Sequence, residues 1–174
     1  MDSGTIVLDG LTLCRTLGGK LTYADPANLR RITLKMGMVF QSYNLFPHMS
    51  VMQNLTDAPM RVRRLSRAQA TERARELLAK VGLSDKADQY PYQLSGGQQQ
   101  RVAIARALAS KPAILLADEP TGNLDSKTSE DVIALLKTTS QTFHQTIVMI
   151  THNPEIAQLA DRVVRIEDGK ILAS

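Results

Sequence analysis

The chain has 174 residues, of which 43% are hydrophobic and 22% charged, and its formal net charge is +4. Those proportions are typical of one soluble globular domain. The single cysteine excludes an internal disulfide framework, and no apolar run approaches the roughly 18 residues of a membrane-spanning helix. We therefore expect a cytoplasmic protein. Aromatic residues make up only 4% of the chain, which argues against a stacking surface for single-stranded nucleic acid.

In chain order, turn residues and hydrophobic periodicity predict the first elements: a β-hairpin over 5–13, a short helix over 26–31, a strand over 36–40, a loop over 42–47 and a helix over 50–60. The hairpin depends on Asp9-Gly10, a pair that favours a tight two-residue turn. Helix 66–81 has the clearest signal, because Ser66 and Gln69 have the spacing of a capping box.

The last part of the chain predicts alternating elements: a helix over 97–110, a strand over 113–117, a helix over 127–142, a strand over 146–150, a short helix over 154–159 and two short strands after residue 162. Residues 113–117 and 146–150 are continuous apolar runs, which is typical of parallel strands buried on both faces. The alternation predicts an α/β fold with a parallel sheet. The helix-rich stretch 50–92 interrupts this alternation, and we expect a separate helical lobe there.

Three of the predicted strands end in polar residues: one at Gln41, one at Asp118-Glu119 and one at Thr151-His152. Ligands gather at the carboxyl ends of the strands in open α/β sheets, so these groups are expected to converge on one edge. Adjacent side chains on an extended strand point to opposite sides. Asp118 can therefore anchor a hard cation such as Mg2+ while Glu119 polarises a water molecule.

The octapeptide 94–101, LSGGQQQR, precedes and opens a predicted helix. Glycines at the start of a helix let an anion approach free backbone amides at the positive end of the helix dipole. Ser95 adds a hydroxyl group and repeats the capping-box spacing with Gln98. A flexible helix cap would explain Ser-Gly-Gly alone. Only the whole octapeptide indicates a specific anion site.

Four motifs in this order, at Gln41, 94–101, 114–125 and His152, resemble those of ATP-binding cassette (ABC) ATPases and together cover most of the chain. The nearest resemblance is to the cassettes of polar amino acid importers and of lipoprotein and macrolide exporters. It implies an α/β fold like that of the P-loop NTPases. The implied parts are a parallel-sheet core from 1–41 and 93–174, a helical subdomain from 42–92 and an N-terminal β-hairpin.

The resemblance also implies a role for each residue at the strand ends. Gln41 would contact Mg2+ and the attacking water, and Asp118 would hold Mg2+ through water. Glu119 would be the general base, and His152 would touch the γ-phosphate of ATP. These residues would form the catalytic and metal-binding part of the site.

Further residues are implied to bind nucleotide across a head-to-tail dimer of two cassettes. The signature residues that would grip the γ-phosphate of ATP held by the opposite subunit are Ser95, Gly96, Gly97 and Gln98. Asp125 would cross the dimer interface. The dimer could consist of two copies of this chain or of this chain and another ABC ATPase subunit.

The phosphate-binding loop of the family, G-x-x-x-x-G-K-[ST], does not occur in the 174 residues. The nearest candidate is Gly18-Gly19-Lys20, but Leu21 replaces the Ser or Thr and Cys14 replaces the first glycine. We interpret this segment as a loop next to the hairpin. Residues 2–6 resemble the family segment that follows the phosphate-binding helix. The sequence therefore predicts an N-terminally truncated cassette that binds MgATP weakly on its own and leaves strand edges unpaired.

The expected function is that of the ATP-hydrolysing subunit of an ABC transporter, bound to a membrane subunit at the cytoplasmic face of the membrane and without nucleic acid. Residues 42–49 resemble the segment of polar amino acid importers that meets the membrane subunit, although local packing explains its apolar residues equally well. Residues 118–125 instead resemble the exporter branch. Two alternatives stay open: a non-catalytic cassette that donates its signature to a partner, and a soluble ABC protein of DNA repair or translation.

Overall fold

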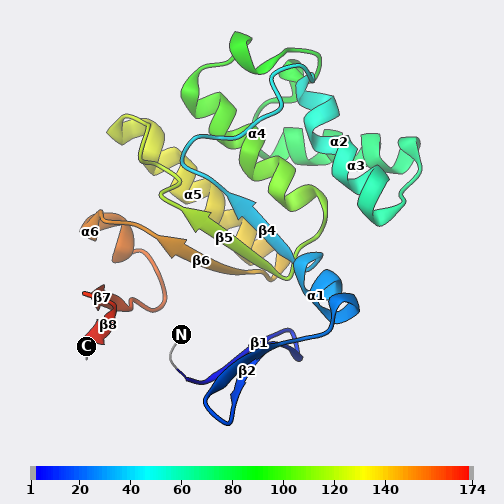
Figure 1. The fold of residues 1–174 in the computed structure, drawn as a ribbon. Coiled ribbons are helices and arrows are strands. Elements are labelled where there is room, and N and C mark those ends of the chain that lie inside the picture. Colours follow the sequence, from blue (N-terminus) through cyan, green and yellow to red (C-terminus); the bar gives the residue numbers. More distant parts are fainter. Residues whose placement is uncertain (1–2, 173–174) are drawn as a thin grey trace.

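The computed structural model describes residues 3–172, whose arrangement is drawn in Figure 1. An antiparallel sheet comes first, in the order β1-β2-β3, formed by β1 (Thr5–Leu8), β2 (Leu11–Leu17) and β3 (Lys20–Tyr23). Asp9-Gly10 and Gly18-Gly19 join the strands, and all four residues have positive φ, as type I′ turns require. The predicted hairpin is confirmed and gains a third strand. The weak candidate for a phosphate-binding loop is the second of these turns.

A parallel sheet carries the three strands with polar ends, in the order β4-β5-β6. Its strands are β4 (Met36–Val39), β5 (Ile114–Asp118) and β6 (Thr146–Ile150). Helix α1 (Pro26–Thr33) leads into β4, and helix α5 (Ser126–Phe143) connects β5 to β6. The described chain ends with α6 (Pro154–Ala157) and an antiparallel pair, β7 (Arg165–Glu167) and β8 (Lys170–Leu172). The predicted α/β class with a parallel sheet is confirmed.

The helices between β4 and β5 pack together above the sheet in the view of Figure 1. They are α2 (Val51–Arg63), α3 (Arg67–Lys80), the 3-10 turns η1 (Ser84–Lys86) and η2 (Pro91–Gln93), and α4 (Gly96–Ala109). Helices α2, α3 and α4 each begin with a serine cap and a glutamine three residues later, and both reciprocal hydrogen bonds are present. The capping boxes predicted at Ser66 and Ser95 are therefore confirmed.

The hydrophobic core lies between the helices and one face of the parallel sheet. Its buried members from the strands, from α2 and α3, and from α4 and α5 include Val39, Leu115, Ala117, Leu55, Leu77, Leu78, Val102, Ile104, Leu108, Val132 and Leu136. No helix within residues 3–172 has the length and apolar composition needed to span a membrane.

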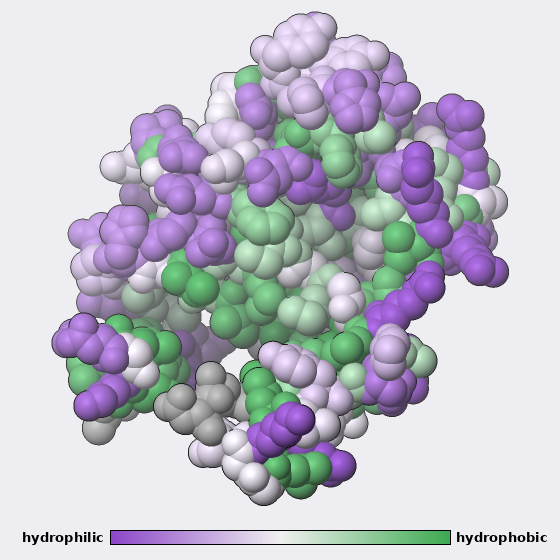
Figure 2. All heavy atoms as spheres, in the orientation of Figure 1, coloured by the Kyte–Doolittle hydropathy of each residue, from purple (hydrophilic) through white to green (hydrophobic). Residues whose placement is uncertain are grey.

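The other face of the parallel sheet is open. Val148 is 47% exposed and Ile150 is 62% exposed, and the exposure of β6 alternates along the strand. Figure 2 shows apolar surface gathered in the middle of this view of the molecule. The prediction that these strands are buried on both faces is wrong, because the described residues cover only one face of the sheet.

Candidate functional site at the carboxyl edge of the parallel sheet

The three predicted strand ends meet at one edge of the sheet. The parallel register places Val39 beside Ala117 and Ala117 beside Met149, so the chain leaves all three strands on the same side. One or two positions further along the three strands, the chain reaches Gln41, Asp118-Glu119 and Thr151-His152. This is the position at which ligands gather in open α/β sheets. The predicted convergence is confirmed at the level of the backbone.

Glu119 and His152 are in direct contact across this edge. Glu119 Oε1 accepts a hydrogen bond of 2.9 Å from the backbone N–H of His152 and lies 2.8 Å from His152 Nδ1. The second contact is a hydrogen bond when Nδ1 carries the proton. The carboxylate side chain is 20% exposed and the imidazole 83% exposed. His152 therefore fixes one oxygen of a carboxylate that solvent still reaches.

Glu119 also has an unusual backbone conformation. Its φ is +43°, in the left-handed region that residues with a side chain rarely adopt. Two backbone hydrogen bonds hold it there, from Glu119 N to Ile150 O at 3.0 Å and from Gly122 N to Glu119 O at 3.0 Å. Such strain, about 1–3 kcal/mol, is found mainly at functional sites. The sharp turn carries the carboxylate out of the strand direction and towards His152.

Gln41 lies against the turn that follows Glu119. Asn123 Nδ2 donates to Gln41 O at 3.1 Å. A methyl group built on Gly122 would stand only 2.5 Å from Gln41 Nε2, so the Gln41 side chain occupies the space that a larger residue would need. The turn that carries Glu119 therefore also positions Gln41.

We expect Gly122→Ala to displace the Gln41 amide. Gly122 does not have a positive φ, so alanine fits the backbone, and the clash falls on the far end of a flexible side chain. Stability should change by less than about 1 kcal/mol, whereas the ATP hydrolysis that the sequence motifs predict should become slower. Urea unfolding and phosphate release measure the two effects. Unchanged turnover would show that the position of Gln41 does not depend on this contact.

Asp118 and Gln41 are the candidates for a metal site. Asp118 is the last residue of β5 and is partly buried. Within the described part of the chain, no group of three or more His, Cys, Asp or Glu side chains could hold a metal ion. The predicted donors are the Asp118 carboxylate and the Gln41 amide oxygen. That set fits Mg2+, which usually takes one or two protein ligands and fills its shell with water and phosphate oxygens.

The signature residues 95–98 lie at the start of α4 and form hydrogen bonds with one another. Ser95 Oγ accepts from Gln98 N at 3.3 Å, and Gln98 Oε1 accepts from Ser95 N at 3.0 Å. Gly97 is buried, and a methyl group built on it would stand 2.4 Å from Thr128 Cγ2 on α5. A methyl group on Gly96 would meet the Tyr43 hydroxyl at 2.8 Å. Close packing on Thr128 thus requires a glycine at 97 independently of any bound anion, whereas the Tyr43 side chain can shift away from a larger residue at 96.

Asp125 caps helix α5. Its Oδ1 accepts from Thr128 N at 3.0 Å, and its Oδ2 accepts from the Thr128 hydroxyl at 2.7 Å. The hydrogen bond from the Thr128 side chain, followed by that from the Thr128 amide, lowers the pKa of Asp125. Thr128 also packs on Gly97 of the signature, so the hydrogen bonds that Asp125 accepts from Thr128 indirectly support the packing of the signature. Within this chain its carboxylate is thus a helix cap.

The lowered pKa predicts a pH-dependent contribution of Asp125 to stability. The folded-state pKa lies below the unfolded value of about 3.9, so the contribution is present above that pH and is lost as the pH falls through the folded pKa. Asp125→Asn keeps a capping oxygen and removes the charge. Its melting temperature should be lower than that of the wild type at pH 7, and the difference should disappear in acid. Asp161→Asn corrects for the change in net charge, and a difference that persists in acid contradicts the prediction.

Sequence analysis missed one buried residue that joins these parts. Gln100 is 0% exposed, and its Nε2 donates to Pro120 O at 2.6 Å and to Phe40 O at 3.4 Å. Those carbonyls adjoin Glu119 and Gln41. A glutamine among the inward-facing residues of α4 was the available signal, since a buried amide needs hydrogen-bond partners.

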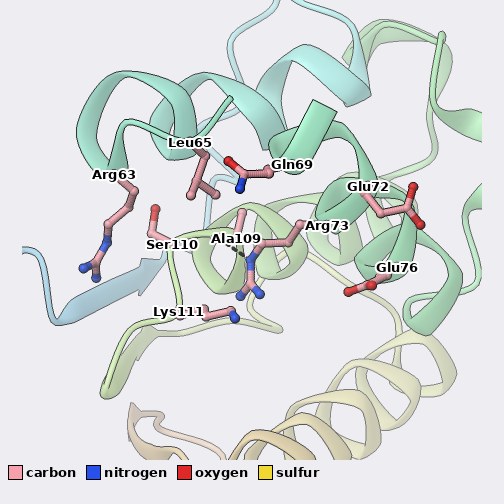
Figure 3. A pocket seen from close by; sticks show the side chains of 9 residues that line it. All are labelled: Arg63, Leu65, Gln69, Glu72, Arg73, Glu76, Ala109, Ser110 and Lys111. Atoms are coloured by element: carbon pink, nitrogen blue, oxygen red, sulfur yellow. Dashed lines mark hydrogen bonds between the residues drawn. The ribbon is translucent and has the colours of Figure 1, made fainter. Parts of the chain in front are cut away.

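A cavity lies elsewhere, between α3 and the end of α4, as Figure 3 shows. Its volume is about 580 Å³, and Arg63, Arg73, Lys111, Glu72 and Glu76 are among the residues that line it. None of the residues predicted for the nucleotide site lines this cavity. The candidate site is therefore the open edge of the sheet and not this cavity.

Known proteins resemble the chain over nearly its whole length. The family profile described as "ABC transporter" matches residues 1–122. A probable amino-acid ABC transporter ATP-binding protein of Sinorhizobium fredii is 44% identical over 173 residues, which cover 98% of this chain and 67% of that protein. The glutamine transport ATP-binding protein GlnQ of Bacillus subtilis is 48% identical over 158 residues, covering 90% of this chain and 65% of GlnQ.

Solved structures of ATP-binding cassettes also resemble the chain. The ATP-binding cassette MJ0796, in a dimeric post-hydrolysis state bound to ADP and Pi, superposes with a TM-score of 0.78 at 37% identity, covering 97% of this chain and 71% of that one. The chain thus spans about two thirds of the length of the relatives that it matches. The motifs, the parallel sheet and these relatives agree: the chain belongs to the ATP-binding cassette family of ABC transporter ATP-binding proteins.

Proposed function

We propose that this chain binds and hydrolyses ATP to power the transport of polar amino acids across a membrane. The observation that carries the proposal is the shared edge at which Glu119 contacts His152 and Gln41 lies against the turn after Glu119. The relatives named above support the substrate class, because their names refer to amino-acid and glutamine transport.

The site residues fit the chemistry of phosphoryl transfer to water. The oxygen of the water attacks the terminal phosphorus of ATP, the bond from that phosphorus to the bridging oxygen breaks, and ADP leaves. Glu119 accepts the proton that the water loses, and the contact with His152 fixes the direction of the carboxylate. Asp118 and Gln41 are the residues that would hold Mg2+, which neutralises charge on the phosphate oxygens when it is bound.

The start of α4 is the proposed contact for nucleotide on a second cassette. Ser95 is exposed at the positive end of the helix dipole, where an anion is stabilised. We assign Ser95, Gly96, Gly97 and Gln98 to the γ-phosphate of ATP held by a homologous or identical subunit, with Asp125 at the interface. The dimeric state of MJ0796 with ADP and Pi supports a pair of cassettes.

The segment between β4 and α2 is the proposed contact for a membrane subunit. It includes Leu45 and the exposed Phe46, and it begins directly after Gln41. A partner at this segment would place the chain at the cytoplasmic face of the membrane. We assign residues 42–92 to a helical subdomain, and 1–41 with 93–174 to the core that carries the chemistry. Nucleic acid has no part in this proposal.

A second candidate function rests on the exposed Ser95 at the start of α4. In that function the chain donates its signature to ATP bound by a competent partner cassette. Mixing the chain with such a cassette separates the two functions. If the donor function holds, Ser95→Ala abolishes the stimulated hydrolysis while Glu119→Gln in this chain does not.

The decisive experiment purifies the protein from membranes with its membrane subunit and reconstitutes that assembly into vesicles. We expect uptake of a polar amino acid such as glutamine or glutamate only when ATP is present. Uptake without ATP, or purification of the protein with nucleic acid in place of a membrane subunit, would contradict the proposal. Apolar amino acids such as leucine and valine serve as specificity controls.

A further inference from the structure

The segment that follows Gln41 has a strained backbone. Tyr43 and Asn44 are consecutive residues with φ of +60° and +49°, a region that asparagine adopts readily but that is unfavourable for tyrosine. Its own hydrogen bonds are short-range, from Asn44 N to Ser42 O at 2.6 Å and from Tyr43 N to Phe40 O at 3.4 Å. A tyrosine in this region persists only where its surroundings hold it. The relevant contacts must therefore come from other elements.

Arg106, near the end of α4, supplies such contacts. Its NH1 donates to Asn44 O at 2.6 Å and its NH2 donates to Tyr43 O at 3.3 Å. Two nitrogens of one guanidinium thus bind the carbonyls of the two left-handed residues. The ring of Phe46 lies 5.7 Å from the guanidinium carbon. Charged donors form stronger hydrogen bonds than neutral ones, and the planar fork of arginine suits two neighbouring acceptors.

Neutral amides hold both ends of the same segment. Asn123 donates to the carbonyl of Gln41. Asn54, which is 1% exposed, accepts from Phe46 N at 2.9 Å and donates to Phe46 O at 3.2 Å. Among these contacts, Arg106 supplies the charged group, and it acts in the middle, where the backbone is strained.

We propose that Arg106 is a positioning residue for Gln41. By holding Tyr43 and Asn44 in the left-handed conformation, it keeps Gln41 against the turn that carries Glu119. Arg106 belongs to the helix that begins with the signature, so the same helix contributes a nucleotide contact at one end and positions Gln41 from the other. The effect on hydrolysis rests on the proposed function, whereas the effect on the segment does not.

Arg73 provides a matched control. It also donates two hydrogen bonds to backbone carbonyls, from Nε to Ala109 O at 2.6 Å and from NH2 to Leu108 O at 2.9 Å, beside the cavity of Figure 3. Desolvation by burial lowers the pKa of Arg73 and of Arg106 alike. Arg73→Met therefore removes the same chemistry and leaves residues 41–46 untouched.

The test compares Arg106→Met and Arg106→Lys with Arg73→Met in the purified protein. Hydrogen exchange of the amides in 42–46 should become about tenfold faster in Arg106→Met, less so in Arg106→Lys, and should not change in Arg73→Met. In the transporter assembly, kcat should fall about tenfold in Arg106→Met while KM for ATP changes less than twofold, because Gln41 acts on water and metal. Arg73→Met should leave both constants unchanged.

If hydrogen exchange of residues 42–46 is unchanged in Arg106→Met, the proposal is overturned. Equal losses of kcat in Arg106→Met and Arg73→Met would also overturn it, because they would indicate a general loss of packing. If Arg106→Met does not fold, Arg106→Lys decides between the same outcomes. An assembly without ATPase activity in the wild type would refute the proposed function. The hydrogen-exchange comparison would then still test whether Arg106 holds residues 42–46 in place.

Discussion

Glu119→Gln should reduce ATP turnover by the transporter assembly about 10²- to 10⁴-fold, the usual effect of removing a general base. Glutamine has the size of glutamate and keeps an oxygen that can accept from the His152 amide, so the turn after β5 is preserved. It cannot accept the proton that the attacking water loses. Phosphate release at saturating ATP measures the loss, and the melting temperature should stay within a few degrees of the wild type.

Glu155→Gln is the control for this substitution. Glu155 is exposed in α6, three residues after His152, and its replacement removes an equal charge near the site. Its turnover should match that of the wild type. If Glu119→Gln retains more than about a tenth of wild-type turnover, Glu119 is not the general base. Equal losses in the two variants would indicate a general electrostatic effect and not proton transfer.

Gly97→Ala should destabilise the protein by about 1–3 kcal/mol, the usual cost of overpacking a buried position. The added methyl group would stand 2.4 Å from Thr128 Cγ2, and Thr128 cannot simply turn away, because its hydroxyl donates to Asp125 Oδ2. Alanine is the better helix former, so a loss of stability would point to this contact and not to helix propensity. Urea unfolding measures the difference.

Thr128→Ser should restore most of that stability. Serine removes the Cγ2 methyl group and keeps the hydroxyl that binds Asp125, so the double variant tests one contact between α4 and α5. The coupling free energy of the cycle should be favourable and comparable with the cost of Gly97→Ala alone. A cycle with no coupling, or Gly97→Ala as stable as the wild type, would show that the close approach is relieved in another way.

The strand ends and the helix starts could be predicted because their signals are local. An apolar run that stops at a polar residue is visible in the sequence at Gln41, Asp118 and His152, and parallel strands bring their ends to one edge. Ser-x-x-Gln likewise lies within one turn of helix. The order of the motifs and the α/β alternation then identify the family without any long-range information.

Other features depend on contacts between distant residues, and the sequence does not show them. Nothing near Gly97 reveals that Thr128 occupies the space of its missing side chain. The arginine that holds Tyr43 and Asn44 lies more than 60 residues away. The sequence overestimates the burial of β6 for the same reason. Apolar residues on both faces of a strand indicate that packing against both faces is favourable, but they do not show that the described residues pack there.

Because the backbone of Glu119 is left-handed, thermal stability and catalysis favour different residues at position 119. Glycine would adopt that conformation without cost, and asparagine nearly so, whereas only a carboxylate can perform the proposed proton transfer. A library of variants sorted solely for survival at high temperature should therefore become enriched in the inactive substitutions Glu119→Gly and Glu119→Asn. Directed evolution of a robust form of this protein has to keep the codon for Glu119 fixed and gain its stability at other positions.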